Sequence, residues 1–361
     1  MLLLVEGQLA AGMRPALVTL SGYGPAAAAR EIPERAVPPS LMSAWNDVRS
    51  WRKSLLDSGA ESQVEIVHAH AFAPGMAAVR SCPIVVYEVH DFVEENAVAL
   101  RQCEERSWLA RSFRVAEQFV VSRAAAVVVH SSRHRAGCAE RGAADDSVFL
   151  IPEPVDLDMP SSDGSDWLQR HGLGDARAIK IFAACEAAQF PGLLEAAAML
   201  PRELHIKLMV PAEPASQFRH DLLASRDTVM MISPADRQCA LAAADLVIAG
   251  TTGAALEAMI AAKPVLAVDV PGNRDVSRDG RGCLWYRDGD VRDLGHRVLA
   301  LAGNAELRAA LAEAGRKMVE ETRSPAAVGA AYDAVYRHAA ARRRSLTPSP
   351  PLSLQPLGVP L

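Results

Sequence analysis

One segment, residues 243–289, constrains the fold of this chain more than any other. An apolar run at residues 246–249 leads into the small-residue turn of residues 250–253, and a helical pattern carrying Glu257 leads to a second apolar run at residues 265–268. Short apolar runs on either side of a helix predict a βαβ unit of a parallel sheet. Ligands bind at the carboxyl ends of such strands, and the free amide groups of a helix N-terminus favour anions. The segment therefore predicts a site for a nucleotide or a sugar phosphate.

The rest of the chain repeats this alternation. Apolar runs predict further strands at residues 16–20, 66–68, 84–89, 126–129, 148–151, 179–183 and 205–210. Helical patterns lie between them, at residues 95–122, 189–200, 234–243 and 254–262, and most of residues 287–340 is helical with a break at Pro325. Alternation of this kind predicts an α/β architecture with parallel sheets, and 361 residues suffice for two domains.

Composition excludes several function classes. A net charge of −5 gives no reason to expect a nucleic-acid partner. The six cysteines form no Cys-x-x-Cys pair, which argues for reduced thiols in the cytoplasm and against a disulfide framework or a zinc site. The apolar run of residues 1–5 is too short to span a bilayer.

Contact with a membrane surface is an alternative that the sequence does not exclude. Arg49, Arg52 and Lys53 lie near Trp45 and Trp51, the mixture that helices at a bilayer interface use. A plain solvated helix face is the favoured interpretation, so the expected location is cytoplasmic, with peripheral contact at the inner face of the membrane as the alternative.

The sequence motifs of residues 243–289 resemble those of a known family. In this order it contains Ala244-Asp245, Leu256-Glu257-Ala258-Met259, Lys263-Pro264-Val265, Asp269-Val270-Pro271-Gly272-Asn273 and Asp279-Gly280. These are similar to the C-terminal domain of GT-B glycosyltransferases of the retaining family-four type. Residues 64–79, 82–92 and 121–158 resemble the N-terminal half of the same family, so the resemblance covers roughly residues 1–321.

The resemblance implies an α/β GT-B fold, in which two doubly wound parallel-sheet (Rossmann-like) domains face a cleft. We expect an acceptor-side domain at residues 1–157, a linker at 158–176 and a nucleotide-sugar domain at 177–325. A last helix at 326–344 should return to the first domain, before a Pro-rich disordered tail at 345–361. The family's first strand and glycine loop have no counterpart here, so we expect the chain as given to be truncated at its N-terminus.

The resemblance also implies the roles of single residues. His90 would contact the donor sugar near the reacting centre, and Glu257 would bind the ribose hydroxyls of the nucleotide. Amides and hydroxyls of Thr251, Thr252 and Gly253 would hold the diphosphate, although a Thr there can also simply cap the helix.

Further site residues are expected beside His90. His70 would belong to the acceptor pocket, and Gly75 to the substrate-binding loop that follows it and starts a helix. We expect His68 and His70 to point to opposite faces of their strand. Together with His90 and Asp91 they could be interpreted as a metal cluster. That interpretation is disfavoured because the family needs no protein-held metal, so no metal and no cofactor are expected.

Two departures from the family bear on activity. Ala249 stands eight residues before Glu257, where the E-x7-E motif has its first Glu. Residues 182–191 lack the Arg and Lys that neutralise the diphosphate leaving group in the family, which is usually a large catalytic contribution. Lys207, Arg237 and Lys263 are the candidates to replace them in space.

The leading functional hypothesis is a retaining glycosyltransferase of polysaccharide biosynthesis. It would move a hexose from a nucleotide-diphosphate sugar to a hydroxyl of a glycan or lipid-linked acceptor. Two alternatives stay open. One is a catalytically weak or inactive homologue that acts as the partner of an active glycosyltransferase, which the two departures favour. The other is a nucleotide-sugar epimerase, for which the sequence offers no convincing set of acidic residues.

Overall fold

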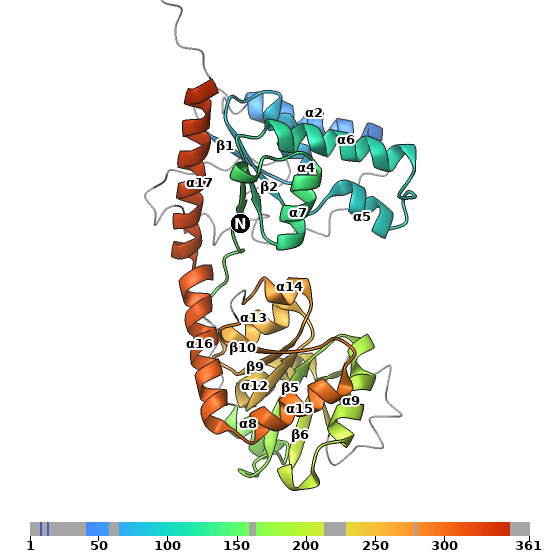
Figure 1. Cartoon of the computed structure of the whole chain (residues 1–361), viewed down its shortest axis with the longest axis vertical. Coiled ribbons are helices and arrows are strands. Elements are labelled where there is room, and N and C mark those ends of the chain that lie inside the picture. The colour runs from blue at the N-terminus through green and yellow to red at the C-terminus, as the bar shows by residue number, and fades with distance from the viewer. Residues whose placement is uncertain are drawn as a thin grey trace, which may run out of the picture. The chain divides into compact units, whose positions relative to one another are not determined.

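The computed structural model describes residues 41–57, 65–158, 164–212, 229–277 and 280–346, together with Gln8 and Met13. The chain divides into two compact units (Figure 1). Unit 1 contains Met1–Glu153 and Val328–Leu361, and unit 2 contains Pro154–Ala327. The two units are described separately below.

Among its described residues, unit 1 contains a four-stranded parallel sheet. Its strands are β1 (Val67–His70), β2 (Val85–Val89), β3 (Ala126–Val129) and β4 (Val148–Leu150), in the spatial order β1-β2-β3-β4. The helices are α2 (Leu41–Asp57), α4 (Phe72–Val79), α5 (Val93–Ala99), α6 (Trp108–Arg123), α7 (Ser132–Glu140) and most of α17 (Pro325–Leu346), with the short 3-10 turn η1 (Asp145–Ser147).

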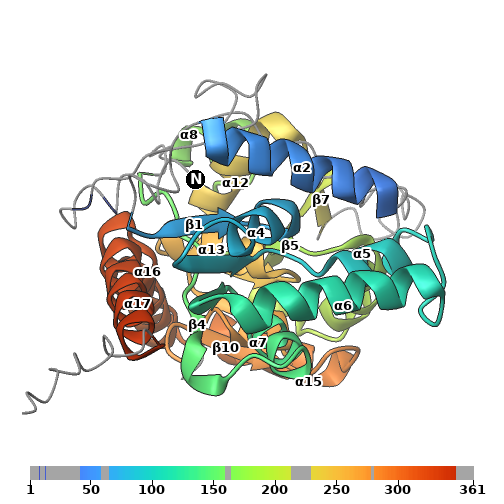
Figure 2. The same cartoon turned by 90° about the horizontal axis from the view of Figure 1, so that it is seen from above.

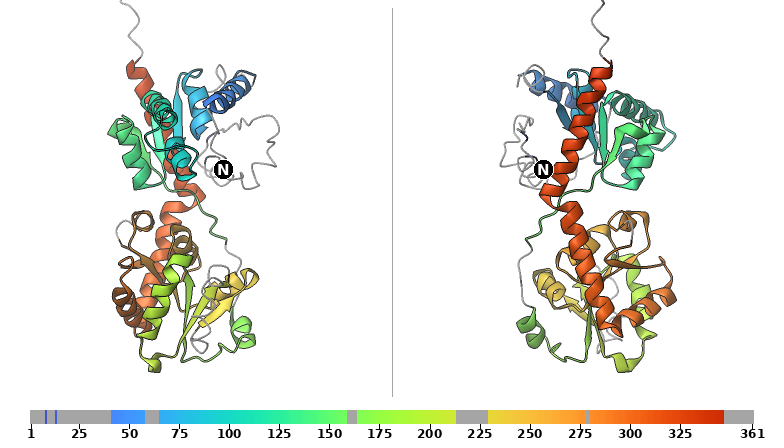
Figure 3. Two further views of the ribbon diagram at one scale, coloured as in Figure 1. Left: turned by 90° about the vertical axis from the view of Figure 1, so that its right-hand side faces the viewer. Right: turned by 60° about the vertical axis from the view of Figure 1, so that its left-hand side comes forward.

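Helices cover both faces of this sheet. On one face, Val86 and Val128 pack against Tyr332 and Val335 of α17, which runs along the strands (Figures 1 and 3). On the other face, β1, β2 and β3 pack against α4, which lies between α2 and α6 (Figure 2). Strands buried on both faces read as continuous apolar runs, which is why the sequence identified them.

The described residues of unit 2 form a six-stranded parallel sheet. Its strands are β5 (Ile179–Ala184), β6 (Ile206–Pro211), β7 (Val229–Ile232), β8 (Leu246–Ala249), β9 (Val265–Val268) and β10 (Cys283–Tyr286), in the spatial order β10-β9-β8-β5-β6-β7. The first strand in the chain is central, and the strands after it fill one side before the other. This is the doubly wound order, and its direction reverses between β5 and β8, at the switch point where such sheets bind ligands.

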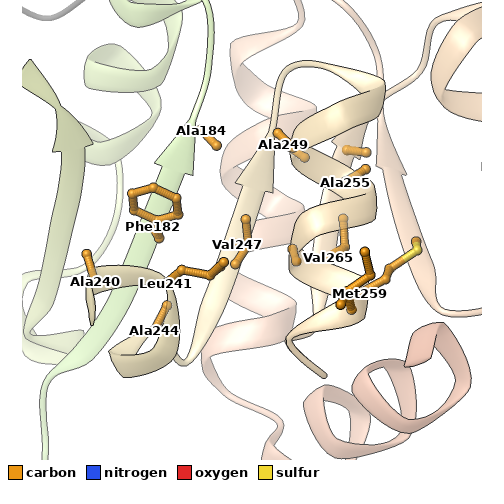
Figure 4. Packing of buried hydrophobic residues seen from close by; sticks show 14 of the residues in the cluster. Phe182, Ala184, Ala240, Leu241, Ala244, Val247, Ala249, Ala255, Met259 and Val265 are labelled. Atoms are coloured by element: carbon orange, nitrogen blue, oxygen red, sulfur yellow. The ribbon is translucent and has the colours of Figure 1, made fainter. Parts of the chain in front are cut away.

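The helices of unit 2 pack on the two faces of its sheet. They are α8 (Ser165–Arg170), α9 (Phe190–Ala198), α12 (Arg237–Ala243), α13 (Thr252–Ile260), α14 (Pro271–Arg274), α15 (Val291–Ala302) and α16 (Ala305–Arg323), with 3-10 turns η2 (Ala187–Gln189), η3 (Arg202–Leu204) and η5 (Pro234–Asp236). Phe182 and Val247 pack against Leu241 of α12 and Met259 of α13 on one face (Figure 4). On the other face, Ile181 and Ile248 pack with α9 and α15.

Two strands of the structure were not predicted from the sequence, and two helices were predicted as one. β7 and β10 are the outermost strands of their sheet and are only partly buried, so they carry a weaker apolar signal. The single helix predicted at residues 95–122 is wrong: α5 ends at Ala99, and α6 starts after Ser107, whose hydroxyl accepts a hydrogen bond from Ala110 N. The predicted strand at residues 16–20 and the tail beyond residue 346 lie outside the described residues.

The helix α2 carries the basic and Trp residues that were considered for membrane contact. Val48 and Leu55 are buried in the core of unit 1, whereas Arg49, Arg52 and Lys53 are exposed. None of the described helices combines the length and the apolar character that a membrane span requires. Contact of α2 with a membrane surface stays a prediction.

Candidate functional site

In unit 2, the turns after β5 and β8 meet at the switch point. A Cβ at Gly250 would lie 2.0 Å from Gln189 Oε1 and 3.0 Å from Cys185 Cα, so a larger residue would have to displace the Gln189 side chain and crowd the Cys185 backbone. Gly250 N donates to Ala184 O at 2.9 Å, which continues the pairing of β5 with β8 into the turn. The close approach of the two turns therefore fixes the position of the N-terminus of α13.

The three residues after Gly250 form that N-terminus. Thr251 caps α13, because its hydroxyl accepts from Ala254 N at 3.2 Å. Thr252 Oγ1 donates to Asn273 Oδ1 at 3.2 Å, and the buried Asn273 amide donates to Val268 O at 2.9 Å. Gly253 is exposed, and a Cβ there would meet no atom within 4 Å. The capping interpretation of Thr251 thus has direct support, and the amides at this helix start remain suited to an anion.

Glu257 lies in the second turn of α13 and is paired with Arg237. The carboxylate Oε2 contacts Arg237 Nη2, and the two side chains are 26% and 37% exposed. Arg237 is the first residue of α12, and its guanidinium also stands 5.4 Å from the centre of the Phe182 ring. Glu257 is therefore held as an oriented acceptor by a guanidinium.

Of the three cations proposed from the sequence, Arg237 alone lies near the carboxyl edge of the sheet. Lys207 is the second residue of β6, and Lys263 precedes β9, so both are at the amino ends of their strands. Lys263 Nζ donates to Ala242 O and to Ala244 O, the latter at 3.1 Å. These two lysines are therefore not in a position to replace the missing basic pair.

Ala249 is the last residue of β8 and is fully buried. Its Cα partners on the neighbouring strands are Ala184 and Ala267, so all three positions hold small side chains. A carboxylate at this position would be desolvated between two strands, which would be costly without a partner. The position assigned to the first Glu of the motif is thus part of the sheet, not of the turn.

In unit 1, polar residues end three neighbouring strands on the face that α17 covers. Along each strand the same face reads Ile66-His68-His70, Ile84-Val86-Glu88-His90 and Ala126-Val128-His130. Register places His70 beside Glu88 and Glu88 beside Val128. Since side chains alternate between faces with a period of two, all five polar residues gather at one end of one face.

Glu88 is the centre of this cluster. Its side chain is 4% exposed. The carboxylate atom Oε1 lies 2.9 Å from His70 Nδ1, 3.1 Å from His90 Nε2 and 3.2 Å from His130 Nε2. The other atom, Oε2, lies 3.1 Å from His68 Nε2 and accepts a hydrogen bond from the Tyr332 hydroxyl of α17. We name these five residues, His68, His70, Glu88, His90 and His130, the His–Glu cluster.

The structure corrects two expectations about this cluster. His68 and His70 do not point to opposite faces: their rings are 4.3 Å apart, because residues two apart on a strand share a face. Asp91 is not part of it; on the other face, it lies 3.9 Å from His134. Glu88 and His130 were missed. The signals were a lone Glu in the apolar strand β2, and a His that follows β3 as His90 follows β2.

Burial and charge set the protonation of the cluster. Desolvation and the neighbouring His68 lower the pKa of His70 to about 4, so its imidazole is neutral near pH 7. Burial alone would raise the pKa of Glu88, but His70 and hydrogen bonds from the surrounding imidazoles hold it well below its ordinary value. Burial opposes protonation of His130, yet its hydrogen bond to Glu88 raises its pKa. Glu88 is therefore an ionised carboxylate among imidazoles.

Gly75 has a packing role. It is buried inside α4, and a Cβ there would lie 2.7 Å from two ring carbons of Tyr87. The absence of a side chain lets α4 approach β2 closely. This placement accounts for the glycine without the substrate contact predicted from the sequence.

Comparisons with known proteins cover both units. Residues 1–159 match Glycosyltransferase Family 4, and residues 188–304 match Glycosyl transferases group 1. No curated protein matches the chain in sequence.

Solved structures share the fold at low identity. HepE of Anabaena, solved in complex with UDP, is 14% identical over 82% of each chain, with a TM-score of 0.62. A glycosyltransferase from Rickettsia africae is 10% identical over 86% of this chain and 83% of the other, also with a TM-score of 0.62. Sucrose-phosphate synthase from Thermosynechococcus elongatus is 16% identical over 80% and 77%, with a TM-score of 0.57. With its two parallel-sheet units and its two family matches, this chain belongs to the GT-B glycosyltransferases of the family-four type.

Proposed function

We propose that the protein is a retaining glycosyltransferase that moves a hexose from a nucleotide-diphosphate sugar to a hydroxyl of a glycan or lipid-linked acceptor. The observation that carries the donor assignment is the position of the α13 N-terminus at the switch point of a doubly wound sheet. HepE, which shares the fold, has been solved with UDP and with UDP-glucose, so UDP-glucose is the first donor to test.

In unit 2, the diphosphate would bind at the start of α13. The amides of Thr252 and Gly253 supply donors there, and the exposed Gly253 leaves room for a phosphate to approach. Glu257 would accept hydrogen bonds from the ribose hydroxyls, because a carboxylate forms strong charge-assisted bonds with adjacent hydroxyls. Arg237 would hold that carboxylate in one orientation.

In unit 1, His90 would contact the sugar that is transferred. Its side chain is 41% exposed, the most accessible of the four imidazoles around Glu88. An imidazole can donate to or accept from a sugar hydroxyl, and Glu88 fixes the ring by its contact with Nε2. His70 would be the neighbouring contact on the acceptor side.

The second candidate is an inactive homologue that serves as the partner of an active glycosyltransferase. It is favoured by Ala249 and by the lack of basic residues at 182–191, since leaving-group neutralisation is usually a large catalytic contribution. Release of UDP from UDP-glucose by the purified chain, with and without sugar acceptors, separates the two. Turnover above the rate of spontaneous hydrolysis supports the enzyme, and UDP binding without turnover supports the partner.

Substituting Glu257 tests the donor site. Glu257→Ala should weaken UDP binding by roughly 1–3 kcal/mol, because it removes a charged hydrogen-bond acceptor. Glu257→Gln should lose less, since it keeps one oxygen acceptor. Calorimetric titration with UDP measures both. Glu313→Ala, at an exposed position of α16, is the matched control and should bind as wild type does. An unchanged affinity in Glu257→Ala would remove this residue from the donor site.

A further inference from the structure

We propose that the His–Glu cluster of unit 1 binds a divalent transition-metal ion of the Zn²⁺ type. The ligands are the Glu88 atom Oε1 and the imidazole nitrogens of His70, His90 and His130. Glycosyl transfer as proposed above does not require this ion, although the metal site shares His70 and His90 with it.

The spacing of the ligand atoms fits tetrahedral coordination. Zn²⁺ binds imidazole nitrogen and carboxylate oxygen at about 2.0–2.2 Å, so the ligand atoms of a tetrahedral site lie about 3.3–3.6 Å apart. Here Oε1 is 2.9–3.2 Å from the three nitrogens, and His70 Nδ1 is 3.3 Å from His90 Nε2. The ligand atoms of Glu88, His90 and His130 all lie within 4.8 Å of one another. Four of the six ligand-to-ligand distances are therefore close to those of a tetrahedral site, and movement of the His130 ring toward His70 and His90 would complete it.

His130 is oriented so that Nε2 faces Oε1. Its Nδ1 lies 2.8 Å from Ile151 O, and a carbonyl can only accept, so Nδ1 carries the proton. Nε2 lies 3.2 Å from the carboxylate oxygen, where it can donate a second proton to Oε1 or, after losing that proton, bind an ion with its lone pair.

The nitrogens of His70 and His90 compete for the same carboxylate oxygen of Glu88. Three imidazole nitrogens surround Oε1, which has two lone pairs, so hydrogen bonds alone do not satisfy all three well. One ion bound to Oε1 and to the bare nitrogens would replace these competing contacts by coordination bonds.

The outer partners have the arrangement found behind metal ligands. The bond of His130 Nδ1 to a backbone carbonyl leaves Nε2 for the ion. On the far side of the carboxylate, Tyr332 and His68 contact Oε2, and Tyr336 OH lies 2.9 Å from His68 Nδ1. These contacts orient Glu88 so that Oε1 faces the three imidazoles.

The cluster is open to an ion from one side. The side chains of His68, His70 and His130 are 12–20% exposed, whereas that of His90 is 41% exposed. Imidazole with carboxylate is a donor set that suits Zn²⁺, while Mg²⁺ prefers oxygen ligands in an octahedron. The donor set therefore predicts discrimination between these two ions.

The test is metal binding by the full chain, stripped with a chelator and carrying no polyhistidine tag. Calorimetric titration with Zn²⁺ should show one equivalent bound and a raised thermal midpoint, and Mg²⁺ should give neither. Co²⁺ should develop the intense visible bands of a tetrahedral site. His70→Ala and His90→Ala should each weaken Zn²⁺ binding at least tenfold, since even outer partners of metal ligands cost 10–100-fold.

His296→Ala, at an exposed position of unit 2, is the control and should bind as wild type does. Circular dichroism of the metal-free variants shows that they fold. Absence of Zn²⁺ binding by the wild type, or equal binding by the double variant His70→Ala/His90→Ala, would overturn the proposal. UDP release is measured separately, so its failure does not affect this result.

Discussion

Arg141→Met should lower the free energy of unfolding of unit 1 by about 3–5 kcal/mol, the loss typical when one partner of a buried ion pair is removed. Arg141 follows α7, and its side chain is 1% exposed. Its Nε donates to Glu117 Oε2 at 3.1 Å, and its Nη2 donates to Glu94 Oε2 at 3.2 Å. Met fills a similar volume but leaves the Glu117 carboxylate buried without its cation. Urea unfolding of the full chain, followed by circular dichroism, measures the loss.

The loss should depend on pH. Burial raises the pKa of Glu117 from 4.5 to about 7, although Arg141 opposes the shift. A carboxyl whose folded pKa exceeds its unfolded pKa stabilises the protein fully at low pH, and this contribution is lost as pH rises through the folded value. Arg141→Met raises that pKa further, because it removes the attraction to the charged form. The variant should therefore be closer to wild type at about pH 5 than at about pH 8.

Two further variants distinguish the ion pair from general disruption. Arg111→Met, at an exposed position of α6, should change stability by no more than about 0.5 kcal/mol. The double variant Arg141→Met/Glu117→Gln should recover part of the loss, because a neutral amide is less costly to bury than an unpaired carboxylate. A double variant that loses the sum of both single effects would contradict the coupling.

The sequence predicted what depends on local pattern. Strands buried on both faces read as apolar runs, and the turn before α13 favours a small residue because Gly250 approaches the backbone of Cys185. The strand, turn and helix start in unit 2 were therefore visible, down to the capping hydroxyl of Thr251. Its partner Arg237 was not, since twenty residues separate it from Glu257 and the fold alone brings them together.

The His–Glu cluster depends on register between strands, which one sequence does not show. His70, Glu88 and His130 come from three strands, and only the pairing of β1, β2 and β3 places them on one face. Residues two apart on a strand lie on the same face, so His68 and His70 should have been placed together. The prediction from the sequence wrongly placed them on opposite faces. Arg141 illustrates the same limit: a charged residue beside a helix end is usually solvated, yet here it is buried between carboxylates from two other helices.

The other large effect is expected at His90. If the protein transfers glucose, His90→Ala should lower turnover of UDP-glucose about 100–1,000-fold, the cost of losing a hydrogen bond to the sugar that strengthens in the transition state, taken as similar to the loss of one oxyanion-hole donor. Affinity for UDP should change little, because the nucleotide contacts proposed here come from unit 2. Loss of turnover with unchanged binding indicates an interaction made mainly in the transition state. Steady-state UDP release and calorimetry with UDP measure the two quantities.

The same variant removes a proposed metal ligand, so the two roles of His90 must be separated. Turnover of wild type and His90→Ala is therefore compared after stripping with a chelator and again after adding Zn²⁺. A direct contact with the sugar requires that the defect persists in the stripped proteins, where neither holds an ion. If stripping lowers wild type to the level of the variant, the imidazole acts through the metal. If His90→Ala turns over at the wild-type rate under both conditions, His90 has no part in transfer, and the exposed side of the cluster is not where the sugar binds.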